Sequence, residues 1–228
     1  MPESLRTEGI ILHTLDFQDY DQILTVFSID QGIVKFFLQG TRNSRHKKGI
    51  GTTPLTVGEY IYRKGKSDLF YCREISVINQ HLGLRKNLAA LETACDLIQT
   101  VQKSQFPGKP APALYQLLVR YLDSIPLFSS PEILGASFRL KLLRHDGHLG
   151  ITSQCSACGT PLSALYLVRG ESFCKEHATG NVYFFSEEEA DLLNRLAYCR
   201  TISELYLPLP PAFNKRIKEL FTEVILLA

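Results

Sequence analysis

The sequence predicts an α+β protein in which a small five-stranded barrel precedes an all-α domain with a metal-binding insert. Five short segments rich in β-branched and aromatic residues fill the first 80 of the 228 residues. Helical periodicity begins only after them. Two pairs of metal-ligand residues lie in the second half of the chain. The expected domains are therefore residues 1–80 and residues 81–228, with the insert at about 150–185.

The strands predicted in the first domain are residues 9–15, 22–28, 33–39, 55–63 and 69–79. Turn-forming segments separate them, among them Asp30-Gln-Gly32 and the longer stretch from Gly40 to Thr53. Short strands with no helical pattern between most of them favour a small closed or sandwiched β domain. An OB-fold barrel is the leading interpretation, and the spacing alone also fits an SH3-like barrel.

The second domain is expected to be helical around its insert. Ser130-Pro131-Glu132 is a helix start, because proline is tolerated in the first turn and an acidic residue is favoured there. Ser186 and Glu189 form a capping box, in which each side chain accepts a hydrogen bond from the other's backbone amide. The expected helices are residues 87–103, 113–122, about 131–144, about 186–198 and 211–227, with a short strand at 165–168.

Two knuckles in the insert have the spacing of a structural zinc site. Cys155 and Cys158 form the first, and Cys174 and His177 form the second. Four soft or borderline ligands in two such pairs complete a tetrahedral Zn²⁺ shell. A shell filled by the protein has no position for an activated water, so we expect one structural zinc ion. The alternative, four unrelated positions, is disfavoured by the paired spacing.

Composition favours a cytoplasmic protein without a membrane segment. The hydrophobic content of 45% and the charged content of 21% are typical of a globular protein. The N-terminal residues lack the pattern of a secretory signal, and no apolar run approaches the ~18 residues of a membrane span. Three of the six cysteines belong to the knuckles and the others are scattered, which suits a reducing compartment better than a disulfide framework.

Charge is distributed unevenly along the first domain. Residues 1–32 contain one arginine and six acidic residues, whereas residues 33–73 contain nine basic residues and two acidic ones. This reversal indicates two faces of opposite potential, of which the basic one suits phosphate groups. A solvated loop without a ligand is the alternative for the segment from Gly40 to Gly49. The candidate DNA-binding residues are Lys35, Arg42, Arg45, Lys47, Lys48, Arg63, Lys64 and Lys66.

Aromatic residues are interleaved with these basic residues, as in proteins that stack the bases of single strands. Adjacent residues such as Phe36 and Phe37 point to opposite sides of a strand, so we expect at least half of the rings to be in the core. Tyr60 and Tyr62 share one face, and the sequence leaves open whether it is the inner or the outer one. The six rings are Phe36, Phe37, Tyr60, Tyr62, Phe70 and Tyr71.

No motif supports catalysis. The chain contains no phosphate-binding glycine loop, nucleophile elbow or paired-carboxylate site. His145 and His148 are expected to complement the C-terminal end of a helix. Two alternatives to a DNA-binding role stay open: an RNA-binding or ribosome-associated OB-fold protein, and a zinc-dependent hydrolase or deaminase that uses Glu176.

Motifs spread over nearly the whole chain resemble those of one known family, the RecO recombination mediators of bacteria. They are Gly9-Ile-Ile-Leu12, Asp19-Tyr-Asp21, Gly40-Thr-Arg42, Tyr62-Arg63, Phe138-Arg-Leu-Lys-Leu-Leu143 and Cys155-Ser-Ala-Cys158-Gly159. The resemblance implies an N-terminal OB fold, a helical C-terminal domain and zinc bound by the two knuckles. His177 stands where the family pattern has cysteine.

The resemblance also implies a function in DNA repair and recombination without enzymatic activity. Members of this family bind single- and double-stranded DNA, anneal complementary strands, bind RecR and help to load RecA onto DNA covered by single-strand-binding protein. They also bind the acidic C-terminal tail of that protein. Candidate residues for such a peptide are cations of the helical domain, namely Arg120, Arg139, Lys141 and Arg144.

Overall fold

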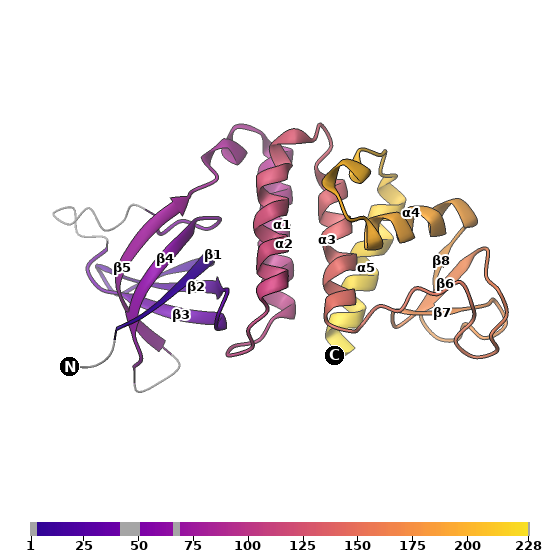
Figure 1. Cartoon of the computed structure of the whole chain (residues 1–228), viewed down its shortest axis with the longest axis horizontal. Coiled ribbons are helices and arrows are strands. Elements are labelled where there is room, and N and C mark those ends of the chain that lie inside the picture. The colour runs from indigo at the N-terminus through magenta and orange to yellow at the C-terminus, as the bar shows by residue number, and fades with distance from the viewer. Residues whose placement is uncertain (1–3, 42–50, 66–68, 228) are drawn as a thin grey trace. The chain divides into compact units, whose positions relative to one another are not determined.

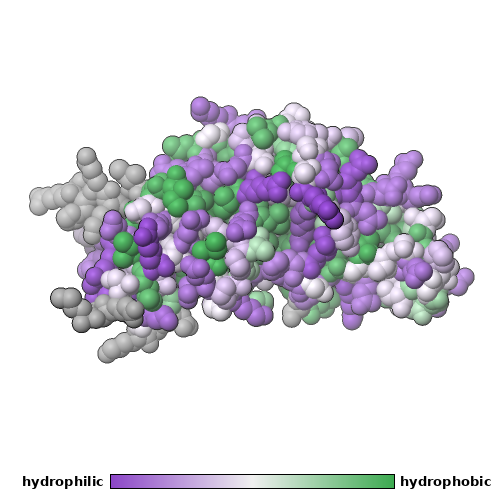
Figure 2. Space-filling model, viewed as in Figure 1, coloured by the Kyte–Doolittle hydropathy of each residue, from purple (hydrophilic) through white to green (hydrophobic). Residues whose placement is uncertain are grey.

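The computed structural model describes residues 4–41, 51–65 and 69–227. The chain separates into two compact units, Met1–Asp123 and Ser124–Ala228 (Figure 1). The first unit contains the predicted strands followed by two helices. The second unit contains three further helices and a small three-stranded sheet. On the face drawn in Figure 2, hydrophobic residues lie among hydrophilic ones.

The first unit is built on a closed barrel with the strand order β1-β2-β3-β5-β4, in which β4 pairs with β1. This closed order confirms the predicted five-stranded barrel and is compatible with an OB fold. The β3–β5 pair is parallel, and the other pairs are antiparallel. The strands are β1 (Leu5–Phe17), β2 (Asp21–Ser28), β3 (Gly32–Leu38), β4 (Val57–Arg63) and β5 (Leu69–Asn79).

Alternate residues of each strand fill the barrel. Phe36, Tyr60 and Tyr62 are at most 2% exposed and lie in one cluster with aliphatic residues of β1, β2 and β3. The rings of Phe36 and Tyr60 are stacked with their centroids 5.1 Å apart. Tyr60 and Tyr62 therefore belong to the inner face, which the sequence had left open. Burial raises the pKa of the Tyr60 hydroxyl.

The turn before β3 requires glycine. Gly32 has a φ of +68°, and a Cβ atom at this position would lie 2.2 Å from the carbonyl oxygen of Lys109. The chain between the two helices of this unit approaches the barrel here, since the Ile33 amide donates to the carbonyl of Phe106. Any side chain at residue 32 would clash with this segment.

Two helices, α1 (Leu88–Ser104) and α2 (Pro112–Ser124), complete the first unit after a 3₁₀ turn, η2 (Leu82–Lys86). The Asn87 side chain caps α1 by accepting from the Ala90 amide at 3.2 Å. Tyr115 of α2 packs against Phe27 of β2, and its hydroxyl donates to Glu8 of β1 at 2.9 Å. These contacts fix α2 to the barrel.

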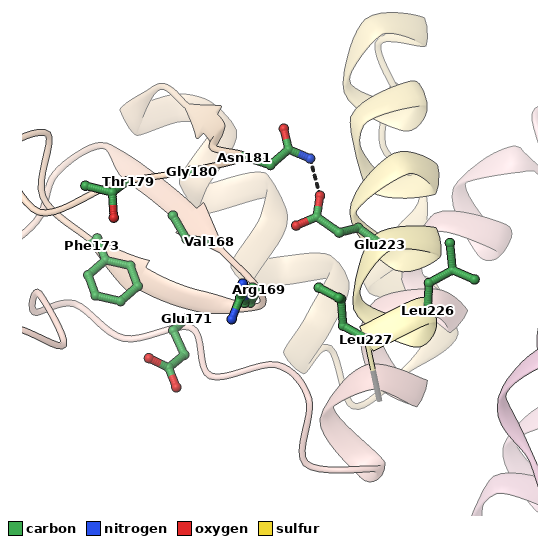
Figure 3. Close-up of a pocket in the computed structure, with 10 residues that line it drawn as sticks. All are labelled: Val168, Arg169, Glu171, Phe173, Thr179, Gly180, Asn181, Glu223, Leu226 and Leu227. Carbon is green, nitrogen blue, oxygen red and sulfur yellow. Dashed lines mark hydrogen bonds between the residues drawn. The ribbon is translucent and has the colours of Figure 1, made fainter.

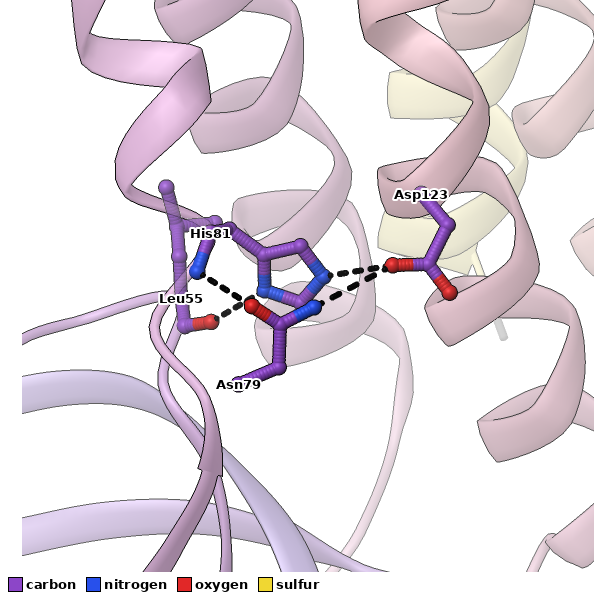
Figure 4. Close-up of polar contacts among 4 residues, drawn as sticks. All are labelled: Leu55, Asn79, His81 and Asp123. Atoms are coloured by element: carbon purple, nitrogen blue, oxygen red, sulfur yellow. Dashed lines mark hydrogen bonds and ion pairs between the residues drawn. The ribbon is translucent and has the colours of Figure 1, made fainter.

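His81 makes a second connection between the barrel and α2 (Figure 4). Its buried ring bonds the Leu55 carbonyl through Nδ1 at 2.8 Å and the Asp123 carboxylate through Nε2 at 3.0 Å. Asn79 accepts from the His81 amide and donates to the same carboxylate. Both Leu55 and His81 have positive φ values, 74° and 48°, so this polar network holds two strained backbone positions.

The second unit packs α3 (Glu132–His145) against α4 (Glu187–Tyr198) and α5 (Pro211–Leu227). Ten of the fourteen residues of α3 are buried, which makes it the central helix of this unit. Two 3₁₀ turns, η3 (Ile125–Leu127) and η4 (Ile202–Leu205), precede α3 and follow α4. The insert between α3 and α4 forms a sheet of order β7-β6-β8, from β6 (Leu165–Val168), β7 (Glu171–Phe173) and β8 (Tyr183–Phe185).

Contacts group α1 and α2 with the barrel, whereas the change from strands to helices lies near residue 80. The domain boundary at residue 80 therefore stays a prediction. Within the part of the chain that the structure describes, none of the helices has both the length and the apolar character that a membrane span requires.

The predicted capping box of α4 is present. The Ser186 hydroxyl accepts from the Glu189 amide at 3.3 Å, and the Glu189 carboxylate accepts from the Ser186 amide at 3.1 Å. The same carboxylate pairs with Arg216 of α5. Burial raises the pKa of Glu189, but the hydrogen bonds from Arg216 and Ser186 outweigh it, so the pKa is lowered overall.

We predict that Glu189→Gln destabilises the second unit by about 0.5–1 kcal/mol at pH 7, because glutamine keeps the cap but loses the ion pair with Arg216. A lowered pKa stabilises the fold above the unfolded-state pKa, and this contribution disappears as the pH falls through the folded-state pKa. Urea unfolding of both proteins at pH 7 and below pH 4 should therefore give a difference that vanishes in acid. A difference that is independent of pH would contradict this assignment.

Candidate metal centre and nucleic-acid interface

The first knuckle, Cys155 to Cys158, is a tight turn held by backbone hydrogen bonds. The Gly159 amide donates to the Cys155 carbonyl at 2.8 Å, and the Cys155 amide donates to the Thr160 carbonyl at 2.9 Å. Gly159 has a φ of +72°, a conformation that favours glycine. The turn brings both cysteine side chains to the same end of the insert.

The second knuckle follows β7 directly. Cys174 is the first residue after this strand, and its carbonyl accepts from the amides of His177 and Ala178 at 3.2 and 3.0 Å. The knuckles are joined through the Ser156 amide, which donates to the Ser172 carbonyl at 2.9 Å. The backbone alone therefore brings two segments sixteen or more residues apart into contact.

The four predicted ligand atoms all lie within 4.8 Å of one another. The Sγ atoms of Cys158 and Cys174 are 4.0 Å apart, and His177 Nδ1 is 3.8 Å from the Sγ of Cys155 and 3.1 Å from that of Cys174. A tetrahedral ion with Zn–S bonds of about 2.3 Å needs ligand atoms about 3.5–3.8 Å apart. The group could therefore hold a metal ion and is compatible with one structural zinc.

The electrostatics of the first cysteine also suit a metal. Burial raises the pKa of the Cys155 thiol, but backbone amides of Cys174, Cys158 and Ala157 outweigh this effect and lower the pKa to about 6. A lowered pKa favours the thiolate, which is the form that binds metals. Among the described residues this is the one group of three or more neighbouring metal-ligand side chains.

The knuckles are attached to the end of α3 through a close backbone contact. Gly170 has a φ of +85°, and a Cβ atom there would lie 2.0 Å from the His148 carbonyl oxygen. The Gly150 amide donates to the Gly170 carbonyl at 2.9 Å. The ring of His145 bonds the adjacent Asp146 at 2.8 Å, so this histidine belongs to the end of α3 and not to the metal group.

A hollow of about 850 Å³ lies between the insert and the end of α5 (Figure 3). Asn181 and Tyr183 both donate to the Glu223 carboxylate of α5, the latter at 2.9 Å. Arg169, in the turn between β6 and β7, also lines the hollow, as does Leu227 of α5. The polar groups on one side of the hollow are thus engaged in holding the insert against α5.

The candidate DNA-binding residues fall into two groups. Lys35 of β3 and Lys64 after β4 are exposed, and Arg63 at the end of β4 is half-buried. Arg63 is paired in register with Tyr71 of β5, and Lys35 with Leu69 of the same strand. The described cations therefore lie on β3 and at the end of β4, the two strands that flank β5. Outside the described residues are Arg42, Arg45, Lys47, Lys48 and Lys66.

The aromatic residues of the barrel divide between its two faces. Phe36, Tyr60 and Tyr62 are in the core, and Phe70 packs against it. Phe37 and Tyr71 lie on the opposite face of their strands, where Tyr71 is 49% exposed. Phe17, at the end of β1, contacts Phe37 and was missed as a candidate. The alternation of Leu15 and Phe17 on an outward-facing strand end is the signal that could have found it.

Three of the four candidate peptide-binding cations are engaged within the second unit. Arg139 is buried, whereas Lys141 donates to the Cys199 carbonyl and Arg144 donates to the Ala197 carbonyl. The latter two satisfy backbone carbonyls at the C-terminus of α4, as expected for cations near a helix end. Arg120 is an exposed residue of α2, in the first unit.

Comparisons with known proteins agree with this architecture. The family model for the N-terminal part of recombination protein O matches residues 1–81, and the model for its C-terminal part matches residues 85–226. The chain belongs to the RecO family. The barrel is accordingly the OB fold of this family, and the C-terminal model covers α1, α2 and the second unit with its Cys₃His group. The family identifies the chain as a protein of DNA repair and recombination.

Curated relatives carry the name DNA repair protein RecO. That of Chlamydia pneumoniae is 28% identical over 198 residues, which cover 86% of this chain and 78% of the relative. That of Pelobacter propionicus is 30% identical over 177 residues, or 76% of this chain and 71% of the relative. The match to Chlamydia trachomatis serovar D is 33% identical over 129 residues and covers only 53% of that relative.

We predict that Cys155→Ser abolishes stoichiometric zinc binding by this RecO protein, because the four-ligand shell loses one strong thiolate bond and keeps only three ligands. Purified wild-type protein should contain about one zinc ion per chain by mass spectrometry of the metal. Limited proteolysis should then cleave the variant first between residues 150 and 185. Cys95→Ser, which changes a cysteine outside the group, is the control and should retain the metal. Reduced wild-type protein that takes up no zinc would contradict the assignment.

Proposed function

We propose that this RecO protein is a non-enzymatic mediator of DNA repair that binds single- and double-stranded DNA and anneals complementary strands. We further propose that it acts with RecR to load RecA onto DNA covered by single-strand-binding protein. The observation that carries the proposal is the OB-fold barrel with basic residues along one side. Its support is membership of the RecO family and the charge reversal between residues 1–32 and 33–73.

The barrel would hold DNA mainly through phosphate groups. Each neutralised phosphate of a single strand contributes about 0.7 to the slope of log K against log salt. Lys35, Arg63 and Lys64 offer three such contacts, on β3 and at the end of β4, on either side of β5. We assign further contacts to the basic residues between Thr41 and Gly51, which lie outside the described residues. Neutralising two strands together reduces their repulsion, and this is our explanation for annealing.

The metal group favours a structural role over a catalytic one. Four protein ligands complete a tetrahedral shell, whereas a catalytic zinc keeps one position for water or substrate. Zinc, when bound, would stabilise the insert that connects α3 and α4. A hydrolase or deaminase would need Glu176 for proton transfer, so Glu176→Gln should leave DNA binding and annealing unchanged under our proposal. If the wild type had a measurable hydrolase or deaminase turnover and this variant lost it while retaining zinc, the enzyme alternative would be supported instead.

For protein partners we propose the acidic C-terminal tail of single-strand-binding protein and RecR. An acidic peptide with an apolar end needs a cation beside an apolar surface. Arg120 is exposed on α2, whereas Lys141 and Arg144 bond the end of α4. A tail-binding role for Lys141 or Arg144 would therefore require these hydrogen bonds to break.

RNA is the second candidate ligand, because phosphate contacts do not distinguish it from DNA. A protein that reads the 2′-hydroxyl group should prefer RNA of the same sequence. We expect equal or weaker binding of RNA in a competition against a labelled DNA strand. A clear preference for RNA would favour a ribosome-associated or RNA-binding role.

We predict that changing Arg42, Arg45, Lys47 and Lys48 to alanine weakens binding of single-stranded DNA by at least about tenfold at low salt and lowers the salt slope by about 2–3. Fluorescence anisotropy of a labelled oligonucleotide over a salt series measures both quantities. A matched control changes Arg85, Lys86, Lys215 and Lys218 to alanine. These four residues are exposed, and their replacement removes the same amount of positive charge elsewhere in the chain. Coincident curves for all three proteins would mean that the segment is only a solvated loop.

A further inference from the structure

A continuous row of side chains crosses the outer face of the barrel. The strand registers pair Leu15 with Ile23, Ile23 with Phe37, Phe37 with Tyr71, and Tyr71 with Arg63. Side chains of paired residues stand beside each other on the same face of a sheet. The row therefore passes over β1, β2, β3, β5 and β4 in turn, perpendicular to the strands.

Phe37 and Tyr71 belong to this row, and Phe17 lies beside it at the end of β1, two residues after Leu15 on the same face. We call Phe17, Phe37 and Tyr71 the aromatic row. The ring of Phe37 lies 6.0 Å from that of Phe17 and 5.7 Å from that of Tyr71, with interplanar angles of 82° and 81°. These edge-to-face contacts fix the orientation of the outer rings. Phe17 is 40% exposed and Tyr71 is 49% exposed, so each presents ring surface to solvent.

The core does not need these rings. The barrel is filled by residues on the inner face of the same strands. One of them is Phe36, next to Phe37 in the chain, which is fully buried. Exposed aromatic residues on neighbouring strands that also contact one another form a contiguous apolar surface, which is characteristic of a ligand-binding site. The position between the β1–β2 turn and the segment after β4 is the side of an OB fold that binds oligonucleotides.

Charge is arranged asymmetrically around the aromatic row. Cations lie on one side of the aromatic row. Lys35 is two residues before Phe37 on the same face of β3, Arg63 is paired with Tyr71, and Lys64 follows Arg63 in the chain. Carboxylates lie on the other side, at the β1–β2 end, where Asp16 accepts from Gln22 at 3.0 Å and Asp21 accepts from the Gly40 amide at 2.8 Å. A polyanion is therefore attracted to the β3, β5 and β4 side.

Building on the proposed DNA binding, we propose that the aromatic row is a stacking platform for the bases of single-stranded DNA. The phosphate backbone lies along Lys35, Arg63 and Lys64, and two bases stack on the exposed surfaces of Tyr71 and Phe17. In a duplex the base faces are covered by neighbouring base pairs. The row therefore gives the barrel a preference for single strands that its phosphate contacts alone do not provide.

The test compares a normal single-stranded oligonucleotide with an abasic one of the same length, which keeps the phosphates and lacks the bases. Anisotropy is measured for the full-length wild type, for Phe17→Leu/Tyr71→Leu and for Phe106→Leu. Phe106 is a matched exposed aromatic residue, and its carbonyl lies beside Ile33 near the opposite end of β3. Both substituted rings are partly exposed, and thermal melting verifies that each variant is folded.

We expect wild type and Phe106→Leu to bind the normal strand at least about tenfold more tightly than the abasic strand. The double variant should lose about 5- to 100-fold in affinity for the normal strand, as stacking of one or two bases is removed. It should bind the abasic strand as wild type does and keep the same salt slope, because the phosphate contacts are intact.

The outcomes separate this inference from the function on which it rests. If wild type binds the normal and abasic strands equally, or if the double variant retains full discrimination, DNA binding stands and the stacking platform is wrong. If wild type binds neither strand at low salt, the proposed DNA binding fails and the platform fails with it. Equal losses by the double variant and Phe106→Leu would also overturn the assignment, since the effect would not be specific to the row.

Discussion

Closure of the barrel by the β1–β4 pairing is the constraint on which the first unit depends. Once the sheet is closed, one face of every strand must fill a small interior, and the other face has to remain outside. Phe36, Tyr60 and Tyr62 occupy the interior, and this leaves Phe37 and Tyr71 on the surface beside Lys35 and Arg63. The arrangement of rings and charges that we associate with DNA is therefore a consequence of register, since a shift by one residue would exchange the two faces.

The insert of the second unit is held together by different interactions. Its three strands are only three or four residues long, too few to form a stable sheet alone. Two backbone turns, the close contact at Gly170 and the Cys₃His group together hold it in place. A metal ion bound by these four residues would connect segments that a small hydrophobic core cannot fix. Under our proposal, this structural role is what the complete set of metal ligands provides.

Much of this architecture could be predicted from the sequence. Segments rich in β-branched and aromatic residues predicted the five strands, Ser186 and Glu189 predicted the start of α4, and spacing predicted the metal group. The inward direction of Tyr60 and Tyr62 could not be predicted, because period-2 alternation defines two faces without saying which is buried. The hydrogen bonds of Lys141 and Arg144 to α4 were missed for a similar reason, since they depend on how two helices pack. The strands β7 and β8 were too short to leave a pattern.

The central claim is that the barrel is the DNA-binding surface of this RecO protein. Hydrogen–deuterium exchange with and without a single-stranded oligonucleotide tests it most directly, because it reports on the backbone of the whole unsubstituted chain. Our account predicts slower exchange in β3 and β5, around residues 35–37 and 69–71, with the exchange of α3 and α5 unchanged. Protection confined to residues 124–227, with none in the barrel, would contradict it.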